Sequence, residues 1–159
     1  MKVNEELVTL QVPASAEYID LVRLTLYGLA VKIGFSYEEI EDMKVAVSEA
    51  CNNAVLYAYG DPLQGEAVQA PQSAPFIEIR FVKRTDALSI IVKDDGRSFD
   101  AAEAARKAQS LHGKTVDELE AGGLGLYLMQ ALMDQVEVKS EDGTEVVLTK
   151  RLAKSGELA

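Results

Sequence analysis

One long helical segment constrains the fold of this chain more than any other feature of the sequence. Apolar residues recur between Ser36 and Tyr59 at steps of three and four, the spacing of a buried stripe on a helix. Ser36 and Glu39 form the S-x-x-E capping box that begins such a helix. We therefore predict a helix that runs to about Tyr59 and buries one stripe: Ile40, Met43, Val47, Ala50, Ala54 and Ala58.

Length and composition indicate a single globular domain over residues 1–159, since 48% of the residues are hydrophobic and 26% are charged. The net charge of −10 argues against direct nucleic-acid binding, although one local pocket can still hold a nucleotide. Cys51 is the single cysteine, which excludes an intrachain disulfide and fits a reducing compartment. No leader-like segment and no membrane-length apolar run is present. We expect a cytoplasmic protein that does not enter a membrane.

The remaining segments predict a sheet with helices on one side. Ser15 is expected to cap the first helix, which ends at Gly34, and residues 60–75 read as a surface loop. The other elements are expected as strands over 7–12, 76–82, 87–92, 135–140 and 144–152 and as helices over 18–33, 101–109 and 126–134. This order predicts the α/β class, as a two-layer sandwich with helices on one face of a mainly antiparallel sheet.

Polar residues interrupt the long helix at SEACNNAV. Glu49 and Asn53 are four residues apart, so both side chains project from the same side of the helix. A carboxylate beside a neutral oxygen is a ligand set that Mg²⁺ accepts, with water and substrate phosphates completing the coordination. An equally simple interpretation is that these residues, with Asn52, mark the solvated face.

Two later segments are further candidates for a site. Asp94 ends a buried strand two residues before Gly96, where it can accept a hydrogen bond inside a pocket, or simply form an Asp-Gly turn. The run Gly122-Gly123-Leu124-Gly125-Leu126 opens a helix, where unpaired N–H groups favour an anion. A plain hinge before the helix would use the same glycines.

Two other segments resemble functional motifs but lack residues that those motifs require. Gly113-Lys114-Thr115 ends like a Walker A loop, but Ala108 stands where that motif needs its first glycine. His112 is the only histidine and has no nearby cysteine, which argues against a zinc site and against a Ser-His-Asp hydrolase.

The three candidate segments, taken in order, resemble one superfamily. An E-x-x-x-N helix, a D-x-G turn, a polar insert and a glycine-rich helix start are the pattern of the ATPases and kinases that include gyrase, the Hsp90 chaperones, histidine kinases and MutL. Within it, nearly the whole chain is similar to the anti-sigma factor serine kinases of Gram-positive bacteria, in particular those acting on sigma-B. YEEIEDMKVAVSEACNNAV, DDGRSFD, TVDELEAGGLGLYLMQALMD and VVLTKRL carry the resemblance.

The resemblance implies a Bergerat-type fold that binds ATP and Mg²⁺, and it implies roles for individual residues. Glu49 matches the family's general base, and Asn53 its magnesium ligand. Asp94 matches the residue that reads the adenine amino group, with Gly96 letting the base sit close. Thr144 matches a threonine that supports adenine. The phosphate-clasping glycine box corresponds to Gly122, Gly123, Leu124, Gly125 and Leu126, and residues 97–121 correspond to the ATP lid.

The chain departs from the family pattern in two places. Ser98 replaces a second glycine after Asp94, and Ala121 stands where a sporulation relative has a lid arginine. This leaves open which cation, if any, faces the γ-phosphate, and Lys114 is our preferred candidate because of its place near the mobile end of the lid. The other candidates are Arg97, Arg106 and Lys107.

The resemblance also implies partners. It predicts a homodimer that binds a sigma factor of the sigma-B type, blocks its use by RNA polymerase, and phosphorylates a serine of an anti-anti-sigma factor. The first helix, with Arg23 and Tyr27, is a candidate for the dimer or partner surface, although we expect most of its side chains to be core. Two alternatives remain: a histidine-kinase-like ATP-binding domain and a sigma-binding module without catalysis.

Overall fold

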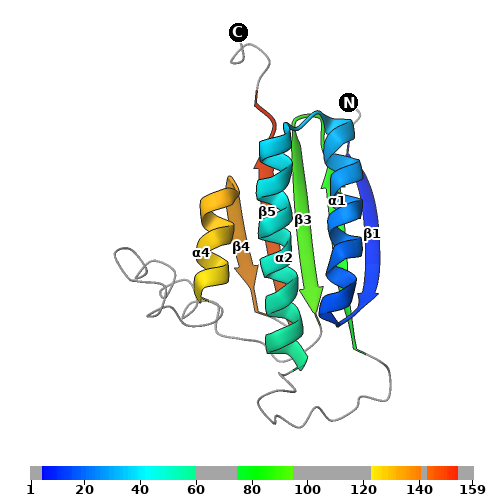
Figure 1. The fold of residues 1–159 in the computed structure, drawn as a ribbon, viewed down its shortest axis with the longest axis vertical. Coiled ribbons are helices and arrows are strands. Elements are labelled where there is room, and N and C mark those ends of the chain that lie inside the picture. The colour runs from blue at the N-terminus through cyan, green and yellow to red at the C-terminus, as the bar shows by residue number, and fades with distance from the viewer. Residues whose placement is uncertain (1–4, 60–74, 95–122, 141–142, 154–159) are drawn as a thin grey trace.

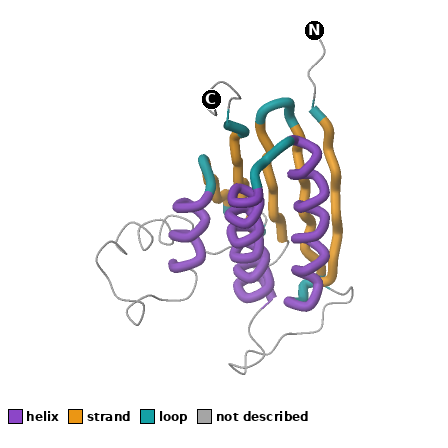
Figure 2. The backbone as a smooth tube through the Cα atoms, turned by 45° about the horizontal axis from the view of Figure 1, so that its top comes forward, coloured by secondary structure: helices purple, strands orange, loops and turns teal. Residues whose placement is uncertain are grey.

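The computed structural model describes residues 5–59, 75–94, 123–140 and 143–153. Within these ranges, three helices lie on one face of a five-stranded sheet (Figures 1 and 2). The elements are β1 (Glu6–Pro13), a 3-10 turn (Ala16–Tyr18), α1 (Ile19–Ile33), α2 (Tyr37–Tyr59), β2 (Phe76–Lys83), β3 (Ala87–Asp94), α4 (Gly123–Leu132), β4 (Gln135–Lys139) and β5 (Thr144–Arg151).

The strands are ordered β1-β2-β3-β5-β4, and every neighbouring pair is antiparallel. Side chains alternate across such a sheet, and one set, including Ile79, Phe81 and Ile90, is fully buried beneath the helices. The predicted two-layer α/β sandwich with a mainly antiparallel sheet is confirmed. Figure 1 shows α2 between α1 and α4, over the middle of the sheet.

Helix α2 begins and packs as its sequence predicts. The backbone N–H of Ser36 donates to Glu39 Oε1 at 2.9 Å, and the backbone N–H of Glu39 donates to Ser36 Oγ at 3.2 Å, which is the reciprocal capping box. The predicted stripe is buried at Ile40, Met43, Val47, Ala50 and Ala54. The side chain of Ala58 lies outside the described residues.

The start of the first helix was predicted wrongly. The side chain of Ser15 makes no capping hydrogen bond. Its carbonyl oxygen instead accepts from the backbone N–H of Tyr18 at 3.1 Å, in a 3-10 turn that precedes α1. The α-helix therefore begins at Ile19, and its C-terminal end at Gly34 is as predicted, with φ at 109°.

Other boundaries shift by a few residues. The first strand includes Pro13, which has no backbone N–H to donate, and an edge strand tolerates such a residue. Helix α4 begins at Gly123, three residues before the predicted start, and ends at Leu132. The predicted helix over 101–109 and the lid over 97–121 lie outside the described residues. Among the described residues, none of the helices has the length and apolar character needed to span a bilayer.

Removal of the capping hydroxyl tests the start of α2. We expect Ser36→Ala to lower the free energy of unfolding by about 1 kcal/mol, because the Glu39 N–H loses its acceptor. Urea denaturation measures this change. Ser15→Ala is the matched control, since that side chain caps nothing, and it should change stability by less than about 0.5 kcal/mol. Equal losses in the two variants would contradict the assignment.

Candidate functional site

Helix α2 directs Glu49 and Asn53 toward α4. Both side chains reach the backbone of Gly125, in the first turn of α4. Glu49 and Asn53 are partly buried, whereas Asn52 on the outermost face is exposed. The predicted pairing of Glu49 with Asn53 on one side of the helix is therefore confirmed, and Asn52 is the solvated member of the group.

Gly125 allows this close approach. A Cβ at this position would lie 3.0 Å from Glu49 Oε2 and 3.2 Å from Asn53 Nδ2, closer than ordinary side-chain contacts. Glycine thus lets the start of α4 lie directly against the carboxylate and the amide. Glu49 and Asn53 precede Gly125 by more than 70 positions in the sequence, yet the fold places them side by side.

The ends of two central strands complete this region. Asp94 is the last residue of β3 and is paired in register with Thr144, the first residue of β5. Both are almost fully buried. Gly143, at φ 97°, makes the turn that leads into Thr144. Among the described residues, the Thr144 hydroxyl has no hydrogen-bond partner, which leaves a buried polar group available to a ligand.

A hollow opens between α2 and these strand ends. It is small and partly open to solvent. Asp94, Thr144 and Asn53 supply its polar atoms, and the rest of the lining is apolar: Ala50, Ala54, Val92 and Val146. Apolar walls with a few convergent polar groups are the kind of lining that small-molecule sites commonly have.

The described residues account for part of the candidate site. They bring together Glu49, Asn53, Asp94, Gly125 and Thr144 around the C-terminal half of α2. Gly123, Leu124 and Leu126 belong to the first turn of α4, where unpaired backbone N–H groups favour an anion. Gly96, Gly122 and the whole lid, including Lys114, lie outside the described residues.

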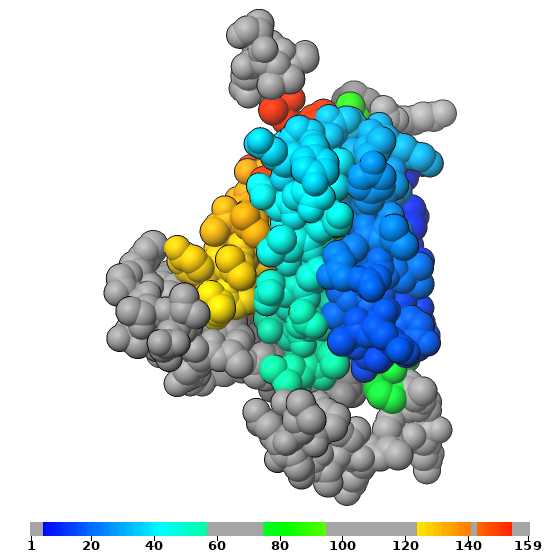
Figure 3. Space-filling view, in the orientation of Figure 1, coloured from blue at the N-terminus to red at the C-terminus, as the bar shows by residue number. Residues whose placement is uncertain are grey.

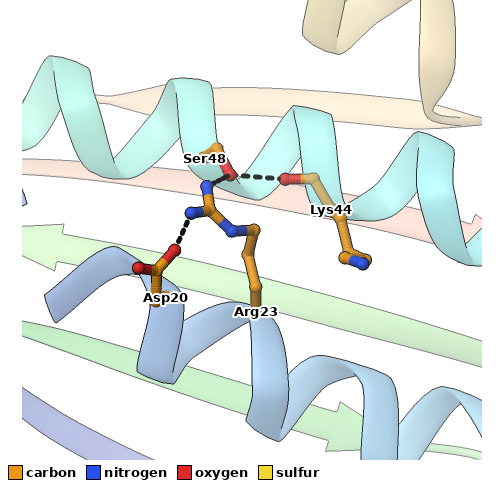
Figure 4. A network of polar contacts seen from close by, with 4 residues as sticks. All are labelled: Asp20, Arg23, Lys44 and Ser48. Carbon is orange, nitrogen blue, oxygen red and sulfur yellow. Dashed lines mark hydrogen bonds and ion pairs between the residues drawn. The ribbon is translucent and has the colours of Figure 1, made fainter. Parts of the chain in front are cut away.

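Two residues beside Glu49 have other roles. Cys51 is fully buried, and burial raises the pKa of its thiol to about 12, an effect that the Arg23 charge partly opposes. Cys51 is therefore a small residue of the hydrophobic core. Ser48, to which the sequence assigned no role, accepts a hydrogen bond from Arg23 of α1 at 2.8 Å (Figure 4).

Comparisons with known proteins agree on one family. Residues 12–150 match the model of the histidine kinase-like ATPase domain. The chain is 46% identical to the serine-protein kinase RsbW of Bacillus subtilis, an alignment that covers 96% of this chain and 89% of that one. It is also 46% identical to the serine-protein kinase RsbW of Bacillus pumilus, over 96% and 90% of the two chains.

A solved structure supports the fold. The crystal structure of the RsbU and RsbW domains of a Mycobacterium tuberculosis protein matches 94% of this chain and 33% of that chain, with a TM-score of 0.61 and 20% identity. At that identity the likeness is evidence for the fold alone.

A methyl group at the crowded glycine tests the site geometry. We expect Gly125→Ala to push Glu49 Oε2 and Asn53 Nδ2 outward and to reduce ATP affinity by about tenfold, since small displacements of positioning groups are costly. Isothermal titration calorimetry measures the affinity, and circular dichroism checks the fold. Gly28→Ala is the matched control, because no atom lies within 4 Å of the added Cβ. Unchanged ATP affinity in Gly125→Ala would contradict this geometry.

Proposed function

The chain belongs to the histidine kinase-like ATPase domain family and, within it, to the serine-protein kinases of the RsbW type, and from this premise we propose which residues carry the reaction and which partners it serves. The protein is an ATP-dependent serine-protein kinase. The observation that carries the residue assignment is the convergence of Glu49 and Asn53 on Gly125, beside a hollow lined by Asp94 and Thr144.

Glu49 is the proposed general base. Its carboxylate takes the proton of a substrate serine while the serine oxygen attacks the γ-phosphorus of ATP. The bond from the γ-phosphorus to the bridging oxygen breaks, and ADP leaves with that electron pair. Glu49 suits this role because it is only partly buried and its carboxylate lies against the first turn of α4, where unpaired backbone N–H groups favour an anion. A positioned base of this kind contributes ~10²–10⁴ in rate.

Asn53 is the proposed protein ligand for Mg²⁺. The carbonyl oxygen of its amide is a hard, neutral donor, and the side chain lies between the hollow and the first turn of α4. Among the described residues, no group of three His, Cys, Asp or Glu side chains gathers as an all-protein cage. One amide oxygen suits Mg²⁺, which usually keeps several waters and takes further ligands from substrate phosphates. The ion, when bound, neutralises charge on the transferred phosphoryl group.

Asp94 and Thr144 are the proposed adenine contacts. The Asp94 carboxylate is suited to accept from the exocyclic amino group, and the buried Thr144 hydroxyl gains a partner when the ring binds. Gly96 would let the ring lie close. The phosphate-binding turn would comprise Gly122, Gly123, Leu124, Gly125 and Leu126, with Lys114 of the lid as the cation near the γ-phosphate.

The proposed partners are a sigma factor of the sigma-B type, which the protein would hold away from RNA polymerase, and an anti-anti-sigma factor that carries the substrate serine. A cytoplasmic homodimer is the proposed assembly. Helix α1 supports a docking role because it buries Val22, Leu26 and Ala30 yet exposes a second apolar row. That row is Leu21, Leu24, Tyr27 and Val31. Helix α1 as a whole lies on the face of the molecule shown in Figure 3.

A phosphotransfer assay tests this function. The purified protein is incubated with ATP, Mg²⁺ and the candidate anti-anti-sigma factor, and the product is treated with acid. Acid-stable phosphate on a serine supports the proposal. Acid-labile phosphate would instead indicate a histidine kinase, and sigma binding without any phosphate transfer would indicate a binding module.

Removal of the base separates catalysis from binding. We expect Glu49→Gln to reduce the phosphorylation rate by at least about 10²-fold, since the amide cannot accept the serine proton. ATP and sigma binding should remain, because the amide keeps the size of the carboxylate. Glu38→Gln is the matched control on the exposed first turn of α2 and should keep full activity. Loss of both binding activities in Glu49→Gln would show that Glu49 is structural.

Neutralisation of Asp94 tests adenine recognition. We expect Asp94→Asn to lower ATP affinity by about tenfold or more, because a hydrogen bond to a charged acceptor contributes roughly 1.5–3 kcal/mol. Calorimetric titration with ATP measures the loss. Asp86→Asn, in the exposed turn between β2 and β3, loses the same charge and should bind normally. An unchanged affinity in Asp94→Asn would contradict the adenine-reading role.

A further inference from the structure

Arg23 of α1 contacts α2 at Ser48, the residue before Glu49. Its Nη1 donates to Ser48 Oγ at 2.8 Å, and its Nη2 forms an ion pair with Asp20 one turn earlier on α1 (Figure 4). The guanidinium is thus held from both sides. About a third of its side chain is exposed, at 35%, so the contact to Ser48 is partly shielded from water.

The Ser48 hydroxyl both accepts and donates a hydrogen bond in this arrangement. It donates to the backbone carbonyl oxygen of Lys44 at 2.7 Å, which orients its oxygen lone pairs toward α1. Arg23 therefore meets an acceptor that is already held by the backbone of α2. A charged donor to an oriented hydroxyl is stronger than a neutral hydrogen bond, so this contact resists sliding and rotation of one helix against the other.

Ser48 and Glu49 lie on opposite flanks of α2. Consecutive helical residues are about 100° apart, and the buried residues Val47, Ala50 and Cys51 mark the side that faces the sheet. Ser48 falls to one side of that buried stripe, against α1, and Glu49 falls to the other, against α4. A rotation of α2 about its axis would break the Arg23 contact and move the Glu49 carboxylate together.

We infer that Arg23, acting through Ser48, is a positioning residue for the Glu49 base. The inference rests on the proposed function of Glu49. A side-chain atom lies about 5–6 Å from the helix axis, so a rotation of about 10° moves it by about 1 Å. A misplacement of that size can cost about 10²-fold in rate. The apolar stripe alone permits small rotations, because its contacts are not directional.

Steady-state kinetics of phosphate transfer tests the inference. We expect Arg23→Ala to lower kcat by about tenfold or more with little change in KM for ATP, because the nucleotide contacts are intact. Ser48→Ala should lower kcat in the same way. The double variant should be no slower than Arg23→Ala alone, since both changes remove one interaction. Arg23→Lys should recover part of the rate, because its ammonium group can still donate to Ser48.

The control is Lys32→Ala, which removes the same charge from an exposed position of α1 and should keep kcat. The inference would be overturned if Arg23→Ala raised KM for the protein substrate with unchanged kcat and Ser48→Ala kept full activity. Arg23 would then be a docking residue. If Arg23→Ala does not fold, Ser48→Ala still decides, since its normal kcat would also overturn the inference. An inactive wild-type protein would instead count against the proposed function.

Discussion

The packing of the α2 stripe on the sheet is the interaction on which the rest of the structure depends. Ile40, Met43, Val47, Ala50 and Ala54 lie against the strands, and this burial fixes which flanks of the helix face its neighbours. One flank holds Glu49 and Asn53 against α4. The same hydrophobic contacts that stabilise the fold therefore also direct the side chains that we propose for the site.

The proposed site forms where β3, β5 and α4 meet the C-terminal half of α2. Strands β3 and β5 bring Asp94 beside Thr144 through their register, and α4 brings Gly125 against the carboxylate. Phosphoryl transfer depends mainly on positioning and charge stabilisation, so such rigid elements suit the reaction of a serine-protein kinase. The packing of the apolar stripe sets the rotation of α2, and the Arg23–Ser48 contact adds a polar, directional restraint from the side of α1.

Much of this architecture was predictable from local patterns. The capping box and the apolar stripe predicted α2, and the four-residue spacing predicted that Glu49 and Asn53 share a side. The register of Asp94 with Thr144 was not predictable from residues alone, because it depends on pairing across 50 positions. The Arg23–Ser48 bond was missed since both residue types are ordinary on helix surfaces. Ser15 was misjudged because a 3-10 turn satisfies the same backbone groups that a cap would.

A crystal structure with Mg²⁺ and a non-hydrolysable ATP analogue is the most direct test of the claim that α2 supplies the general base and the magnesium ligand of an ATP site. The account predicts the adenine amino group on Asp94, the metal on the Asn53 amide oxygen, and the Glu49 carboxylate facing the γ-phosphate. A nucleotide bound elsewhere, or one bound with Glu49 and Asn53 directed away from the phosphates, would contradict it.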